Sequence, residues 1–247
     1  MALVTLKTML DKAYQKRYAV GAFNVINLNF LEAIILAARH TASPVVLNIA
    51  EVHFPFVTME YIVPVVREIV KRERFDVVLN LDHGKTIDAI ERALANGFTS
   101  IMFDGSHLDF DENVQQTREV ARMCHAWNIS IEAELGAVGG AEGGGLVGDA
   151  DPAKYTDVGQ AKTFVEQTGI DALAVAIGNS HGRSRASQTW ILSVCAPFGM
   201  RLAFRWFCMA VRASRRTISA WPYRSVLPRL ISLPGCRKRP CRQQPVT

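Results

Sequence analysis

The sequence predicts an α/β fold, a (β/α)8 barrel (TIM barrel) that is incomplete here, with about six βα units followed by a tail of different character. Three observations support this. Short apolar, β-branched runs alternate strictly with segments of helical periodicity. The runs are almost continuously apolar, as in parallel strands covered by helices. Ionisable residues also follow the runs, where a barrel gathers its chemistry at the carboxyl ends of its strands.

An open, doubly wound sheet fits the alternation equally well, but it would spread those ionisable residues along a line. The nucleotide-binding versions of that fold also lose support. The chain has no G-x-G-x-x-G after its first predicted strand and no G-x-x-x-x-G-K-[ST] anywhere. The barrel is therefore the favoured architecture.

Six strands and five of the helices between them are predicted, at about 30 residues per unit, the spacing of a βαβ repeat. The strands are expected at Tyr18–Val25, Pro44–Ala50, Asp76–Leu81, Thr99–Phe103, Ile129–Glu134 and Asp171–Ile177. The helices are expected at Leu31–Arg39, Thr58–Arg72, Thr86–Asn96, Asn113–Trp127 and Val158–Thr168. Asp157 directly precedes the last helix and is expected to cap it.

The composition changes sharply between residues 183 and 184. Residues 1–183 hold 16 Lys and Arg against 23 Asp and Glu, whereas residues 184–247 hold 12 Lys and Arg and no acidic residue. The second segment also has four of the five cysteines and none of the six histidines. We therefore expect two parts, a barrel segment (1–183) and a tail (184–247).

The hydropathy pattern predicts no association with membranes. No apolar run reaches the 18 residues or so that a membrane span needs. The amino-terminal segment is amphipathic and has no cleavable signal, which predicts a cytoplasmic protein.

The first candidate functional residues stand at or just past strand ends, namely Asn24, Glu51, Asp82, His83, Asp104, Glu134 and His181. Asp82 and His83 end a buried run, and such an ionisable pair is costly unless it faces a polar site. A base and a metal ligand are the functional interpretation, and a structural cap is the alternative. Asp104 opens the turn DGSH, where an Asx turn explains it nearly as well as a ligand role does.

Further candidates follow the fifth and sixth strands. Glu132 and Glu134 alternate along one strand, so both face the same side and need a metal or a basic partner. We favour Glu134 because it is nearer the strand end, and His181 is a candidate ligand after the sixth strand. The loop at 136–151 carries seven glycines and fits either a phosphate cradle or a mobile lid that delivers Glu142 as a proton carrier.

Several motifs in residues 1–183 together resemble one family. They are AFNV (22–25), LDHG (81–84), MFDGSH (102–107), EAELG (132–136), GLVGDADPAKYTD (145–157), FVEQTGIDALAVAIG (164–178) and NSHG (179–182). The sequence resembles the class II, zinc-dependent ketose-bisphosphate aldolases, in the fructose- and tagatose-bisphosphate branch. The resemblance implies a (β/α)8 barrel, usually a homodimer or homotetramer, that binds a phosphorylated ketose and catalytic Zn²⁺.

The resemblance also implies roles for individual residues. Asp82 would be the catalytic acid/base, and His83 and His181 would bind the catalytic zinc. The remaining implied roles are a second divalent metal position bound or supported by Asp104 and Glu134, substrate contacts from Asn24 and Gly182, and a mobile proton-transfer loop carrying Glu142.

This chemistry is coherent for retro-aldol cleavage. Zinc polarises the C2 carbonyl and holds the negative charge of the enediolate, while a carboxylate takes the C4 hydroxyl proton. The other solution is a Schiff-base lysine in a desolvated site. It is disfavoured because the relevant lysines lie in loops or helices, namely Lys85, Lys154 and Lys162.

The tail departs from the family pattern, in which a Y-K-G-E-P segment and an H-G-G-S-G strand end follow. In a shifted reading frame, each new codon joins the third base of one codon to the first two bases of the next. Read in this way, the codons for Ser184–Cys195 can encode K-G-E-P-N-L-D-F-E-R-L. In the same frame, the four codons that span Trp206 to Ala210 can encode only Val, then Leu, then His or Tyr, then Gly. The codons for Pro228–Lys238 can encode K-I-N-F-F-T-G-M-S-Q. We infer a frameshift after Arg183.

The frameshift predicts a disordered or misfolded tail, a barrel with open edges, and impaired aldolase activity. The alternative is a non-catalytic protein whose basic tail binds anions or nucleic acid non-specifically. No motif predicts recognition of a specific nucleic acid.

Overall fold

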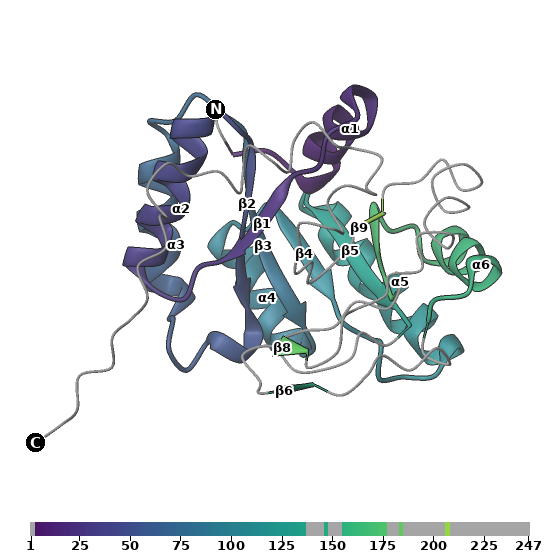
Figure 1. Ribbon diagram of the computed structural model, residues 1–247. Helices are drawn as coiled ribbons and strands as arrows, with labels where there is room; N and C mark the ends of the chain where they lie inside the picture. The colour runs from purple at the N-terminus through teal and green to yellow at the C-terminus, as the bar shows by residue number, and fades with distance from the viewer. Residues whose placement is uncertain (1–2, 137–145, 148–154, 177–182, 185–205, 208–247) are drawn as a thin grey trace, which may run out of the picture.

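The computed structural model of the chain describes residues 3–136, 146–147, 155–176, 183–184 and 206–207. Its centre is a parallel sheet in the order β1-β2-β3-β4-β5-β7-β9 (Figure 1). The strands are β1 (Gly21–Asn24), β2 (Val45–Ala50), β3 (Val77–Gly84), β4 (Ser100–Phe103), β5 (Ser130–Leu135), β7 (Ala172–Val175) and β9 (Trp206–Phe207). A separate parallel pair joins β6 (Leu146–Val147) to β8 (Arg183–Ser184).

The helices lie between consecutive strands, after an additional helix at the amino end (Figure 1). They are α1 (Leu6–Lys16), α2 (Leu28–Thr41), α3 (Met59–Val70), α4 (Ile87–Asn96), α5 (Phe110–Ala126) and α6 (Val158–Thr168), with a 3-10 turn η1 (Glu51–His53) after β2. Five of them begin at a side-chain cap that accepts a backbone N–H three residues on, from Thr5, Asn27, Thr86, Asp109 and Asp157. The predicted cap at Asp157 is therefore confirmed.

The predicted fold class is confirmed, because every predicted strand and helix is present and all the strands of the main sheet run parallel. Two details differ from the prediction. The third strand does not end at Leu81 but continues to Gly84. The short strand β9 also pairs with β7, so one edge of the expected six-strand sheet is extended by two residues. Within the described part of the chain no pairing joins β1 to β9, so these strands form part of a barrel.

The two faces of the sheet bury different side chains. The outer face packs against the helices in one large apolar cluster that includes Leu47, Leu79 and Ile131. The inner face is apolar near the amino ends of the strands, where α1 places Leu6 and Met9 in a second cluster with residues Val46, Val78 and Ala172, and a small third cluster of Met102 and Ala174 lies further along the same face. This alternation follows from the two-residue period of a strand.

Further along the strands the inner face becomes polar. The register aligns five amide and hydroxyl residues across neighbouring strands, namely Asn24, Asn48, Asn80, Ser100 and Ser130. Nδ2 of Asn80 donates to Oδ1 of Asn48 at 3.2 Å, and the backbone N–H of Lys7 in α1 donates to Oγ of Ser130 at 3.0 Å. The ionisable residues lie beyond this polar row, toward the carboxyl ends.

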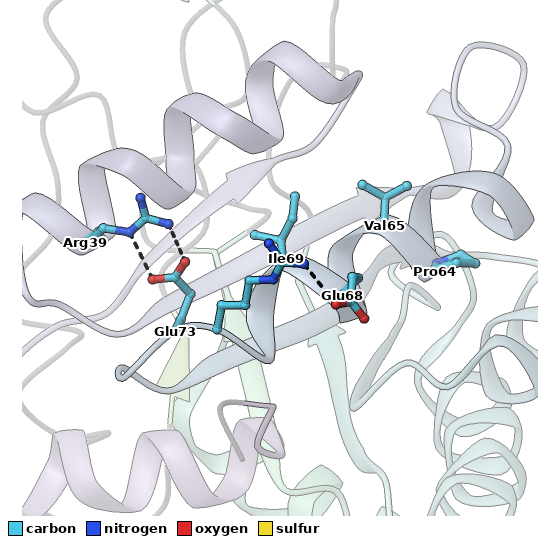
Figure 2. Close-up of a pocket in the computed structure, with 7 residues that line it drawn as sticks. Arg39, Pro64, Val65, Glu68, Ile69 and Glu73 are labelled. Atoms are coloured by element: carbon cyan, nitrogen blue, oxygen red, sulfur yellow. Dashed lines mark hydrogen bonds and ion pairs between the residues drawn. The ribbon is translucent and has the colours of Figure 1, made fainter.

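A pocket of about 480 Å³ lies on the outside of the molecule between α2 and α3 (Figure 2). Its charged side chains pair with one another, since Arg39 contacts Glu73 at 2.5 Å and Arg72 contacts Glu68 at 3.3 Å. It therefore offers a ligand little uncompensated charge. None of the helices in the described ranges has both the length and the apolar character needed to cross a membrane.

Candidate metal centre

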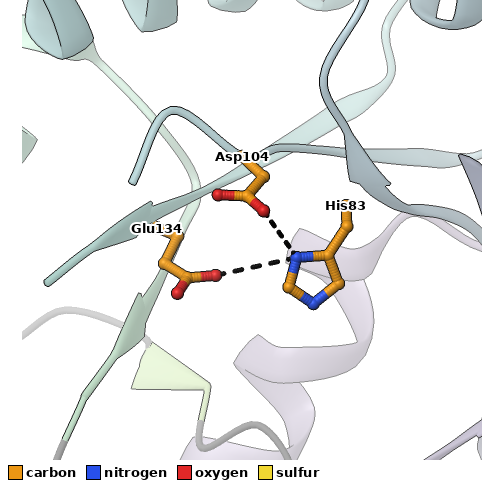
Figure 3. Close-up of side chains that lie close together, drawn as sticks. All are labelled: His83, Asp104 and Glu134. Atoms are coloured by element: carbon orange, nitrogen blue, oxygen red, sulfur yellow. Dashed lines mark hydrogen bonds and ion pairs between the residues drawn. The ribbon is translucent and has the colours of Figure 1, made fainter. Parts of the chain in front are cut away.

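Three consecutive strands bring a histidine and two carboxylates together (Figure 3). His83 comes from β3, Asp104 directly follows β4, and Glu134 belongs to β5. Their ligand atoms all lie within 4.8 Å of one another. Nδ1 of His83 is 2.8 Å from Oδ2 of Asp104 and 3.8 Å from Oε2 of Glu134. With side chains only 11%, 7% and 3% exposed, the cluster is suited to a cation that compensates the buried carboxylates.

An irregularity in β3 shapes this cluster. The register between β3 and β4 shifts between Leu81 and Gly84, so that Asp82 and His83 together stand opposite Met102. Such a bulge redirects side chains that would otherwise point to opposite faces. His83 has a left-handed backbone conformation with φ of 46°, which costs on the order of 1–3 kcal/mol at a non-glycine residue and persists only where neighbouring structure holds it.

The electrostatics of the cluster are dominated by the pairing of His83 with Asp104. Burial lowers the pKa of His83, but the hydrogen bond to Asp104 and the charges of Asp82 and Glu134 outweigh it and raise the pKa to about 9. Burial raises the pKa of Asp104, but hydrogen bonds from His83 and Ser106 outweigh it and hold the pKa far below its ordinary value. With these side chains alone, an imidazolium compensates the carboxylates.

Asp104 has the structural role that the sequence left open as well as a place in the cluster. Its Oδ1 accepts the backbone N–H of Ser106 at 3.2 Å and the hydroxyl of Ser106 at 2.6 Å, which closes an Asx turn. Its Oδ2 faces His83. One oxygen of Asp104 therefore closes the turn while the other faces His83, and the turn fixes the position of the carboxylate beside that histidine.

Glu132 lies on the same strand as Glu134, one level deeper in the sheet. It is 1% exposed, and its Oε1 has no hydrogen-bond partner among the described residues. Burial raises the pKa of Glu132 to about 8, and the negative charges of Asp82 and Glu134 add to the effect. This carboxyl group is therefore largely protonated at neutral pH.

The structure places some of the predicted site residues together and leaves others untested. Asp82 is buried at the bulge beside His83, and Asn24 is half-buried at the end of β1. Glu142, His181 and Gly182 lie outside the described residues.

The structure also gives a part to Ser106, which was not among the predicted residues. Its position two residues after an aspartate, in the turn DGSH, is the usual signal of a side chain that closes an Asx turn. Lys85 follows β3 directly, in a loop as predicted, and its Nζ lies 3.8 Å from Oδ2 of Asp104.

The fold and this cluster define a barrel-type α/β protein with a candidate divalent-metal centre at the carboxyl ends of its strands. The chain belongs to the class II fructose-bisphosphate aldolase family, whose model matches residues 4–194. It is 41% identical over 183 residues to a fructose-bisphosphate aldolase of Giardia intestinalis, a match that covers 74% of this chain and 55% of that protein. The chain thus spans little more than half the length of this curated relative.

Solved structures show the same fold. The YdjI aldolase from Escherichia coli K12 superposes with a TM-score of 0.77 at 29% identity, over 87% of this chain and 76% of that one. The fructose-bisphosphate aldolase from Campylobacter jejuni superposes with a TM-score of 0.62 at 22% identity, over 76% of this chain and 61% of that one. At that identity the second likeness concerns the fold alone.

The side chains of the cluster fit zinc, the metal on which class II aldolases depend. One imidazole nitrogen and two carboxylates form a nitrogen and oxygen set that suits zinc. Burial and the negative charges of Asp82 and Glu134 raise the pKa of Glu132, which is a further sign that negative charge gathers beside this set.

Proposed function

We propose that the chain descends from, and retains part of, an enzyme that cleaves and forms a ketose 1,6-bisphosphate of the fructose or tagatose type. The products of cleavage would be dihydroxyacetone phosphate and glyceraldehyde 3-phosphate. The observation that carries the proposal is the cluster of His83, Asp104 and Glu134 at the carboxyl ends of three strands, in a member of the class II family.

In this proposal His83 and His181 hold the catalytic Zn²⁺, and Asp104 and Glu134 bind or support a second divalent position. Bound zinc supplies Lewis acidity that polarises the substrate's C2 carbonyl. Asp82, buried at the bulge next to His83, accepts the proton of the C4 hydroxyl.

Three further residues complete the proposed site. Asn24 and Gly182 contact the substrate, and Glu142 carries a proton on the glycine-rich loop. We propose that the protein works in the cytoplasm and that its complete form is a homodimer or homotetramer, as the family resemblance implies.

We further propose that the activity of this chain is impaired. Catalytic zinc sites normally use three protein ligands, and no histidine follows His181 in the sequence. In the shifted reading frame the codons permit the H-G-G-S-G segment that the family pattern expects, so residues 184–247 would be an out-of-frame tail. DNA sequence across the codons for Arg183 to Arg185 tests this part directly. A base sequence that does not encode the shifted peptide would refute it.

The function itself is tested by zinc content and by cleavage of fructose and tagatose 1,6-bisphosphate in a coupled assay. We expect the wild type to bind zinc and to cleave the substrate slowly. The Asp82→Asn variant should still bind zinc, but its cleavage rate should fall about 100-fold or more, the usual contribution of a general base. Asp88→Asn is the matched control, since Asp88 is an exposed acid on α4. A wild type that binds no zinc, or an Asp82→Asn variant that cleaves as fast as the control, would contradict the proposal.

A further inference from the structure

Glu51 makes a set of hydrogen bonds that the proposed mechanism does not use. It begins η1 directly after β2, and its carboxylate reaches across to the segment that follows β3. Oε2 accepts the backbone N–H of Lys85 at 2.5 Å and that of Thr86 at 3.2 Å, and Oε1 accepts the hydroxyl of Thr86 at 2.8 Å. One carboxylate therefore binds two successive residues that lie 34 and 35 positions further along the chain.

These bonds fix the connection between β3 and α4. β3 ends at Gly84 and α4 begins at Ile87, so Lys85 and Thr86 form the whole connection. Thr86 also caps α4, because its Oγ1 accepts the backbone N–H of Ala89. A negative charge beside the amino end of a helix is electrostatically favourable, so Glu51 is well placed to hold the connection.

The connection begins two residues after His83, whose left-handed conformation needs support from its surroundings. On one side the carbonyl of Gly84 accepts the backbone N–H of Asp104 at 3.0 Å. Gly84 has little room to move, because a Cβ there would lie 2.8 Å from Cδ2 of Leu81 and 3.0 Å from the carbonyl oxygen of Met102. On the other side the support comes from Glu51 through the N–H of Lys85.

We propose that Glu51 is a positioning residue for the candidate metal centre. Its carboxylate holds the connection from Lys85 to Thr86, so that the bulge keeps the imidazole of His83 against Asp104 and Glu134. The affinity of the cluster for a divalent cation then depends on a residue that touches none of the three donors. This inference rests on the proposed function, because it assigns to Glu51 the support of a site that binds zinc there.

A purely structural role for Glu51, as an extra cap of α4, predicts something different. Loss of a cap lowers the stability of the protein but leaves the folded site unchanged. Thr86→Val separates the two roles, because it removes the Oγ1 that caps α4 and one of the three bonds to Glu51, and leaves the bond between Glu51 and the N–H of Lys85.

The experiment measures the Zn²⁺ dissociation constant of the full chain by competition with a chromogenic chelator, together with urea unfolding without added metal. We expect Glu51→Gln to weaken zinc binding about 10- to 100-fold, the usual effect of removing a group that orients a metal ligand. Thr86→Val is expected to lower the unfolding midpoint while the dissociation constant stays within about threefold of wild type. Glu60→Gln is the matched control, because the Glu60 carboxylate pairs with Arg92 between helices α3 and α4.

Zinc affinity of Glu51→Gln within about twofold of wild type would overturn the inference, as would an equal loss in Thr86→Val. A second measurement, the NMR resonances of the His83 ring in protein without metal, keeps the inference testable if the wild type binds no zinc. We then expect the ring resonances to shift in Glu51→Gln and to stay in place in Glu60→Gln. Unchanged ring resonances in Glu51→Gln would overturn the role of Glu51, whereas a wild type without zinc affinity counts only against the proposed function.

Discussion

The substitution Glu132→Gln tests whether a buried carboxyl group in the sheet is protonated. Burial, with the charges of Asp82 and Glu134, raises the pKa of Glu132 from 4.5 to about 8. An acid whose pKa is raised in the folded state stabilises the fold in its protonated form, so this stability is present below about pH 4.5 and is lost as the pH rises through about 8. Glutamine has the shape of the protonated acid and cannot lose the proton.

The expected magnitude follows from the size of the shift, at 1.36 kcal/mol per pKa unit. Between about pH 5.5 and pH 9, the wild type should lose roughly 3 kcal/mol of unfolding free energy relative to Glu132→Gln. Urea unfolding of both proteins without added metal, at several pH values in this range, measures the difference. His83 titrates in the same range in both proteins, so the comparison largely cancels its contribution.

Glu60→Gln is the control for the change of side chain alone. The hydrogen bond from Arg92 lowers the pKa of Glu60, so its contribution is constant above about pH 5 and no pH-dependent difference is expected there. A difference between Glu132→Gln and wild type that stays constant from pH 5.5 to 9 would refute the reasoning, because it would mean that Glu132 does not change its charge in that range.

Three further predictions concern single residues. Asp104→Asn should lower the pKa of His83 from about 9, and an NMR titration of the His83 ring without metal would show it. The variant should also lose less stability than the wild type as the pH rises from about 6.5 through 9, because the contribution of the pairing between His83 and Asp104 is gone while those of the other groups remain. Gly84→Ala should lower the unfolding free energy by about 1–3 kcal/mol in urea, because its Cβ would meet backbone of β4 that has little room to move. Asp157→Ala removes the cap that accepts the N–H of Gln160 and should lower the unfolding free energy by about 1 kcal/mol in the same assay.

The sequence predicted the order and type of the elements well because both depend on local patterns. The helix at Val158–Thr168 has the predicted ends, since Asp157 caps it and Gly169 ends it in a left-handed conformation with φ of 73°. The strand ends were predicted less precisely. An apolar run identified β3 only as far as Leu81, whereas pairing with β4 carries the strand on to Gly84.

The sequence also pointed to the three residues of the cluster, His83, Asp104 and Glu134, but not to their geometry. Motifs indicated these residues as candidates, yet the two-residue period of a strand places Asp82 and His83 on opposite faces. Only the bulge brings both toward the site, and the bulge depends on pairing with β4 and on the connection held by Glu51. These are contacts between segments more than 15 residues apart, which no local pattern records.

The inner face of the sheet shows why a cation belongs at this place. From the amino to the carboxyl ends of the strands, the layers change from apolar side chains that pack against α1, through amides and hydroxyls, to carboxylates with Met102 and Ala174 beside them. Burying a carboxylate is unfavourable without a partner of opposite charge, and here Glu132 responds by holding a proton while His83 becomes an imidazolium. A metal ion that binds the imidazole nitrogen must displace the proton from His83. The cluster therefore exchanges the proton of the His83 imidazolium for a metal cation. In either state a positive charge lies beside the carboxylates, so the strands can keep them buried whether or not a metal is bound.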